Sequence, residues 1–166
     1  MSSPRRSALD PIERVSEVVF GVLMALSFTG ALSVATAGRE EVRTMMLTAL
    51  GCNLAWGLTD AVMYLVGTVV ERSREAAGAK LAWADYAGAL EVFVLVVLAT
   101  FPVVVPFIFL RDTALALRAS NALAIATLFA GGYALGRYAE ASPWRFGLAL
   151  AAIGVVLVGA IVALGG

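Results

Sequence analysis

Five apolar stretches, each long enough to cross a lipid bilayer, follow one another along this chain of 166 residues. A membrane-spanning helix needs about 20 mostly apolar residues to cross a hydrocarbon core of roughly 30 Å. The stretches cover about residues 15–37, 42–70, 81–110, 113–135 and 146–164. Hydrophobic residues make up 61% of the chain, whereas a soluble domain is nearer half apolar. We therefore predict an all-α polytopic membrane protein, in which five transmembrane helices form a single domain over residues 1–166.

The distribution of Lys and Arg predicts how these helices are oriented. If the five helices alternate in direction, eight of these basic residues fall on the side of the N-terminus and four on the other side. Loops on the cytoplasmic side carry the excess of positive charge. We therefore expect a cytoplasmic N-terminus and a C-terminus outside. The short chain and its Ala- and Arg-rich composition favour the inner (plasma) membrane of a bacterium.

The composition also limits the chemistry that the chain can perform. It contains no His and a single Cys, Cys52, so it lacks the commonest transition-metal ligand and any paired-thiol zinc site. Its formal net charge is zero, which gives no basic surface for nucleic acid. Because no nucleophile is paired with a base, we predict neither an enzyme nor a firmly bound cofactor. Carboxylate, amide and Met sulfur ligands would suit Mg²⁺, Mn²⁺ or Fe²⁺ better than Zn²⁺.

A carboxylate near the middle of the second predicted span, Asp60, is the strongest candidate for a functional group. An ionised Asp at the centre of a span costs about 2.5–3.5 kcal/mol on insertion scales, so it faces protein or trapped water. Polar and aromatic residues recur around it at helical spacing: Asn53, Trp56, Gly57, Asp60, Met63 and Tyr64. We interpret Asp60 as a group that binds a cation or exchanges it for a proton. The alternative is a structural carboxylate paired with an Arg of a neighbouring helix.

Two further acids lie in or beside predicted spans. Glu17 begins a stripe that also carries Met24, and it could guard an entrance on the cytoplasmic side, with Met24 as a soft ligand deeper in. The alternative is a local salt bridge between Glu17 and Arg14, with Met24 as packing. Glu91, in the third predicted span, could join Asp60 across a helix interface or extend back to the membrane surface.

The remaining polar and special residues predict local structure rather than chemistry. We expect residues 71–75 to form a solvated turn of mixed charge between the second and third spans. Trp83 and Tyr86 fit the aromatic belt at a membrane surface. Pro102 and Pro106 should bend the far half of the third span.

Several of these features together resemble the vacuolar iron transporter-like family. They are the five spans with an internal N-terminus, the acids on the first two helices, the run Ala99-Thr100-Phe101-Pro102-Val103-Val104-Val105-Pro106-Phe107, and the stretch from Asn121 to Gly132. The chain has Met24-Ala25 where that family carries an Asp-Gly pair, and it lacks the family's long Glu-rich cytoplasmic extension. The resemblance implies a homodimer that exchanges ferrous iron or manganese for protons, along a pathway between the subunits lined by first- and second-helix residues.

We therefore expect a proton-coupled transporter of a divalent cation, Fe²⁺ or Mn²⁺. Asp60 would be the central ligand, assisted by Asn53 and Met63, while Glu17 and Glu91 would gather cations at the cytoplasmic mouth. One alternative is a proton or monovalent-cation channel in which Asp60 titrates. Another is a membrane subunit without transport activity, whose acids pair with a basic helix of a partner protein.

Overall fold

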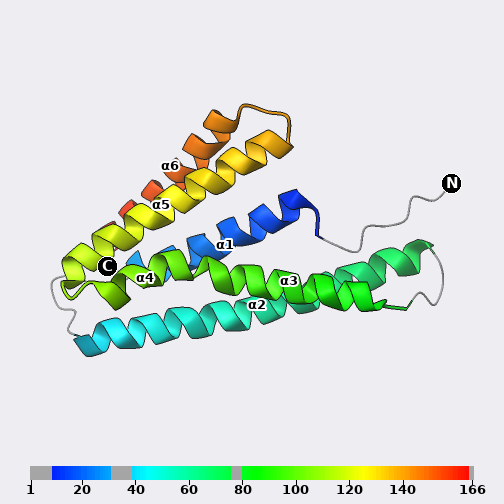
Figure 1. Cartoon of the computed structure of the whole chain (residues 1–166), viewed down its shortest axis with the longest axis horizontal. Helices are drawn as coiled ribbons and strands as arrows, with labels where there is room; N and C mark the ends of the chain where they lie inside the picture. Colours follow the sequence, from blue (N-terminus) through cyan, green and yellow to red (C-terminus); the bar gives the residue numbers. More distant parts are fainter. Residues whose placement is uncertain (1–8, 31–38, 76–79, 165–166) are drawn as a thin grey trace.

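The computed structural model describes residues 9–30, 39–75 and 80–164, and within these residues every regular element is an α-helix. The elements are α1 (Pro11–Gly30), α2 (Arg39–Glu75), α3 (Trp83–Ala99), α4 (Phe101–Phe109), α5 (Thr113–Tyr138) and α6 (Pro143–Ala163). As Figure 1 shows, α5 and α6 run side by side in one layer, α2 lies along α3 in a second layer that α4 extends, and α1 passes between these two layers.

Four helical segments are long and apolar enough to cross a membrane: Glu40–Arg74, Trp83–Phe109, Thr113–Tyr138 and Pro143–Ala163. They coincide with the last four predicted spans and indicate an integral membrane protein. The third of these segments consists of α3 and α4 together. The first predicted span, residues 15–37, begins within α1, and its residues 31–37 lie outside the described part of the chain.

Helix α1 is the shared centre of the bundle and contacts α2, α3, α4, α5 and α6. Its residues Val22, Ala25 and Leu26 are fully buried, and they pack with Val103 of α4 and Leu128 of α5 in one apolar core. A helix in this position can present acidic groups to neighbouring helices on several sides.

Small residues allow α5 and α6 to approach very closely. A Cβ added to Gly132 would lie 2.5 Å from the backbone oxygen of Phe146, and one on Gly136 would lie 2.7 Å from Cα of Pro143. This agrees with the close helix contacts expected from small residues at four-residue spacing. Gly51 and Ala55 of α2 have the same spacing, but no heavy atom of the described residues lies within 4 Å of a Cβ added to Gly51.

The third apolar segment is interrupted at Thr100, between α3 and α4. Pro102, which has no backbone N–H, is in the first turn of α4, and Pro106 lies inside that helix. The division between the two helices therefore lies just before the first Pro. In contrast, the prediction of a turn at residues 71–75 is wrong, because α2 continues through Glu75 as a helix of 37 residues.

Candidate functional site

The inner face of α2 carries a line of small and polar residues. Its buried and half-buried positions recur every three or four residues: Ala49, Asn53, Gly57, Asp60, Ala61 and Tyr64. The opposite face is apolar and exposed, with Leu54, Leu58 and Val62 each at least 45% exposed. Of the predicted stripe, Asn53, Gly57, Asp60 and Tyr64 therefore face the bundle, whereas Trp56 and Met63 are exposed.

Asp60 and Glu17 form a pair of acids between α2 and α1. Each side chain is half-buried, and the negative charge of Asp60 acts on the carboxyl group of Glu17. Oδ2 of Asp60 is buried and accepts no hydrogen bond. Among the residues that the structure describes, neither acid has an Arg or Lys nitrogen within 4.0 Å. Two half-buried like charges without a cationic partner are unfavourable, so a proton or cation bound here would relieve their repulsion.

Two glycines set the separation of the helices that carry this pair. A Cβ on Gly57 of α2 would lie 3.2 Å from the backbone oxygen of Phe93, and a Cβ on Gly21 of α1 would lie 2.8 Å from Cβ of Ala99. Both helices therefore pack directly on α3. This common support holds α1 and α2 next to each other, with Glu17 and Asp60 on the sides that meet.

Asn53 connects three helical segments in the interior. Its side chain is 1% exposed, and its Nδ2 donates to the backbone oxygen of Gly21 at 3.3 Å and to Oγ1 of Thr100 at 2.6 Å. Its Oδ1 is buried and has no partner. The amide nitrogen of Asn53 thus has a structural role, and only its oxygen remains available as a ligand.

The other residues predicted for the site are not all gathered around Asp60. Met63 is 59% exposed on the outward face of α2, and Met24 is half-buried on α1. Glu91 forms an ion pair with Arg14, in which Nε of Arg14 lies 2.8 Å from Oε1 of Glu91. Arg14 therefore neutralises Glu91 across the α1–α3 interface, whereas the sequence suggested Glu17 as its local partner.

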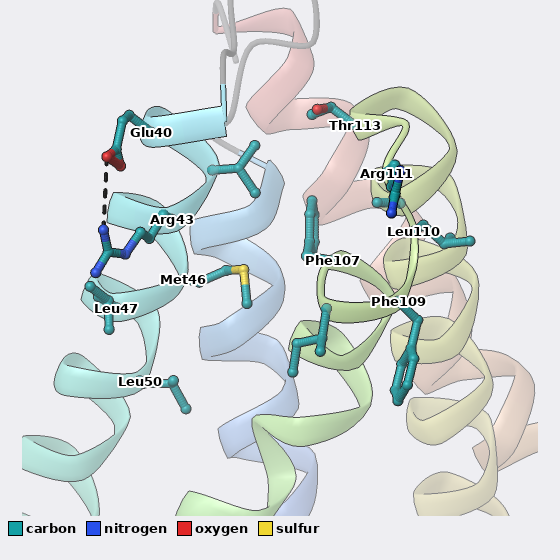
Figure 2. Close-up of a pocket in the computed structure, with 13 residues that line it drawn as sticks. Glu40, Arg43, Met46, Leu47, Leu50, Phe107, Phe109, Leu110, Arg111 and Thr113 are labelled. Atoms are coloured by element: carbon teal, nitrogen blue, oxygen red, sulfur yellow. Dashed lines mark ion pairs between the residues drawn. The ribbon is translucent and has the colours of Figure 1, made fainter.

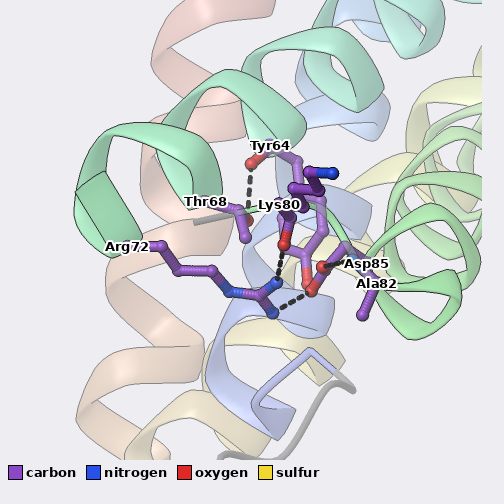
Figure 3. A network of polar contacts seen from close by, with 6 residues as sticks. All are labelled: Tyr64, Thr68, Arg72, Lys80, Ala82 and Asp85. Carbon is purple, nitrogen blue, oxygen red and sulfur yellow. Dashed lines mark hydrogen bonds and ion pairs between the residues drawn. The ribbon is translucent and has the colours of Figure 1, made fainter. Parts of the chain in front are cut away.

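A second ion pair, which the sequence did not predict, joins α2 to the start of α3 (Figure 3). Nη2 of Arg72 lies 2.6 Å from Oδ1 of Asp85, and Nη1 of Arg72 donates to the backbone oxygen of Lys80 at 3.0 Å. The other oxygen of Asp85 accepts a hydrogen bond from the backbone N–H of Ala82, which caps α3. The signal available in the sequence was an acid three residues after the start of an apolar run.

Tyr64 lies between this ion pair and the acid pair. Its hydroxyl end contacts α3 at Gly88, where an added Cβ would be 2.6 Å from the tyrosine oxygen. The charges of Arg72, Asp85, Glu91 and Glu13 all act on its hydroxyl group. The ionisable groups named above on α1, α2 and α3 therefore lie near one another, and of these acids Glu17 and Asp60 have no cationic partner among the described residues.

Within the described ranges, no three acidic or Cys side chains converge closely enough to form a metal-binding cluster. The acid pair is a two-carboxylate site in a single chain. Comparison with models of known protein families and with characterised proteins finds no match.

Proposed function

We propose that this chain is a membrane transporter that moves a divalent cation, Fe²⁺ or Mn²⁺, in exchange for protons. The observation that supports the proposal is the pair Glu17 and Asp60, two carboxylates inside an apolar bundle with no cationic partner in the described residues. In the absence of a metal ion, protons would relieve the repulsion between them. Binding of a divalent cation would displace those protons, which couples the two ions.

The ligand types support this choice of cargo. Oxygen ligands from carboxylates and amides suit Mn²⁺ and Fe²⁺. Asn53 lies seven residues before Asp60 on the same face of α2, and its Oδ1 is free of hydrogen bonds. The cation would bind first at Asp60 and Glu17 and then at Asn53, which lies farther along the inner face of α2.

We further propose that two copies of the chain share the pathway. The two carboxylates of one chain are too few for a complete shell of oxygen ligands around a divalent ion. Beside them, Phe20 of α1 and Trp56 of α2 are 44% and 38% exposed, and their rings are 5.7 Å apart. A second copy against this surface would supply another acid pair. It would also cover Met63, which lies exposed on the outward face of α2 and whose sulfur does not face the acid pair of its own chain.

Metal uptake into proteoliposomes tests the proposal. Purified protein is reconstituted in vesicles containing a metal-sensitive dye, and influx of Mn²⁺ or Fe²⁺ is followed with an imposed pH gradient. We expect Asp60→Asn to reduce uptake at least tenfold. Asp112→Asn is the matched control, because Asp112 caps α5 at another place and Asn can keep the cap. Uptake by Asp60→Asn equal to that of the unsubstituted protein would refute the assignment.

A second candidate is a proton or monovalent-cation channel, which the absence of a three-acid cluster from the described residues favours. A conduit for protons or monovalent ions needs only one or two titrating groups along its path. Current across a planar bilayer distinguishes the two functions. A channel would conduct without divalent ions and would not be blocked by them, whereas a Mn²⁺ transporter would show competition between metal ions.

A further inference from the structure

A groove opens at the end of the bundle where α2 begins and α4 ends, and its lining includes neither Glu17 nor Asp60 (Figure 2). Its volume is about 750 Å³. Its lining comes from the first turns of α2, from the end of α4 and from the connection to α5. The groove forms because α2 packs along α3 but makes few contacts with α4 beyond the interruption at Thr100.

The inner part of the groove is apolar. Met46 and Leu50 contribute from α2, and Phe107 and Ile108 contribute from α4. From Glu40 at its rim to Leu50 is ten residues of helix, or about 15 Å. That depth is half of a hydrocarbon core of roughly 30 Å, which is the thickness of one lipid leaflet.

The rim of the groove carries two guanidinium groups on different elements. Arg43 lies on α2, and Arg111 lies between α4 and α5. Arg43 is turned toward Glu40, as Figure 2 shows, but this ion pair is long, at 3.8 Å, and its side chains are 73% and 83% exposed. Such exposed pairs contribute little, so Arg43 is free to take another anion. Arg111 has no carboxylate within 4.0 Å among the described residues.

We propose that this groove binds one anionic phospholipid. Its phosphate interacts with Arg111 and with Arg43 released from Glu40, and one acyl chain lies along Met46, Leu50 and Phe107. Basic groups at the mouth of an apolar cleft between membrane helices are the arrangement that recognises anionic headgroups. The matching depth of the apolar wall favours a lipid over a soluble anion. This site is separate from the acid pair and does not depend on the transport proposal.

Native mass spectrometry of the purified full-length chain tests the proposal. The chain is titrated with phosphatidylglycerol or phosphatidylcholine that carries the same acyl chains. We expect phosphatidylglycerol adducts to dominate at equal concentration. The double variant Arg43→Gln/Arg111→Gln should bind phosphatidylglycerol about 30-fold more weakly, because each basic group near an anionic surface adds roughly one kcal/mol. Both side chains are exposed, so this variant should fold normally.

Three further variants and one competitor make the test specific. Arg74→Gln/Arg145→Gln removes the same charge at exposed sites elsewhere and should bind as the unsubstituted chain does. Glu40→Gln should strengthen binding, because it frees Arg43. Met46→Trp should weaken binding by filling the apolar wall. Soluble glycerol phosphate should not compete at lipid concentrations.

The proposal is overturned by any of three results. They are equal binding of the two lipids, unchanged binding by the Arg43→Gln/Arg111→Gln variant, and competition by glycerol phosphate.

Discussion

The 2.6 Å hydrogen bond from Asn53 to Thr100 ties the middle of α2 to the point where the third apolar segment is interrupted. Both side chains are buried, and the same amide also donates to α1 at Gly21. Replacing either partner should therefore destabilise the contact among three helices. In membrane proteins such side-chain hydrogen bonds average about 0.6 kcal/mol and reach about 1.7 kcal/mol.

A double-mutant cycle measures this bond. We expect Asn53→Ala and Thr100→Val each to lower the free energy of unfolding in mixed micelles, and the double variant to lose less than the sum. The coupling should fall between about 0.6 and 1.7 kcal/mol. Additive effects would mean that the two side chains stabilise the fold independently.

The ion pair of Arg72 and Asp85 should contribute more to the free energy of unfolding than its place near a helix end suggests. The Asp85 side chain is 3% exposed and that of Arg72 is 23% exposed, so Arg72→Met leaves a carboxylate buried without its cation. Loss of one member of a buried pair costs about 3–5 kcal/mol. Because Arg72 is partly exposed, we expect a loss of roughly 2–3 kcal/mol.

The control for this variant keeps both side-chain shapes without the charges. Arg72→Met/Asp85→Asn should recover part of the loss, since Asn can still accept the hydrogen bond from Ala82. Thermal unfolding of all three proteins in one detergent provides the comparison. A double variant less stable than Arg72→Met would show that the charge of Asp85 is needed for a reason other than its partner.

Gly132 should tolerate no side chain at all. An added Cβ would lie 2.5 Å from a backbone oxygen of α6, which cannot rotate away as a side chain can. We expect Gly132→Ala to destabilise the chain by at least about 1–3 kcal/mol, the range for overpacking. Gly67→Ala is the control, because no heavy atom in the part of the chain that the structure describes lies within 4 Å of its added Cβ. That variant should be neutral, or more stable through its better helix propensity. Melting temperatures that fall equally in both variants would contradict the close approach of α5 and α6.

Glu17 and Asp60 should act in transport as a single unit. If the two carboxylates share a cation or proton, Glu17→Gln should reduce metal uptake strongly. The double variant Glu17→Gln/Asp60→Asn should then be no slower than Asp60→Asn alone, since groups that act together give non-additive losses. Uptake rates in proteoliposomes at saturating metal decide this. Multiplicative losses in the double variant would indicate two separate steps.

Much of the helical framework could be predicted from the sequence, because membrane thickness dictates the length of an apolar run. The predicted spans 81–110, 113–135 and 146–164 correspond to Trp83–Phe109, Thr113–Tyr138 and Pro143–Ala163. The polar face of α2 was also predictable, since helical periodicity places Asn53, Gly57 and Asp60 together.

The ion pairs could not be predicted, because they depend on how each helix is rotated about its axis. Arg14 reaches Glu91 across 77 positions of the sequence, although Glu17 is only one turn away. Likewise, Arg72 was assigned to a solvated turn because charged residues usually end a span. The helix instead continues, and this carries Arg72 back onto α3.

The length of α2 has a consequence for the lipid environment. Its 37 residues extend over about 55 Å, nearly twice the thickness of a hydrocarbon core of roughly 30 Å. A helix of this length must either tilt or project from the membrane into water. The ion pair of Arg72 with Asp85 links α3 to it near one end. Thinner or thicker bilayers would change its inclination, and with it the orientation of every group along its inner edge. The length of the lipid acyl chains should therefore change the tilt of α2 without any substitution in the protein.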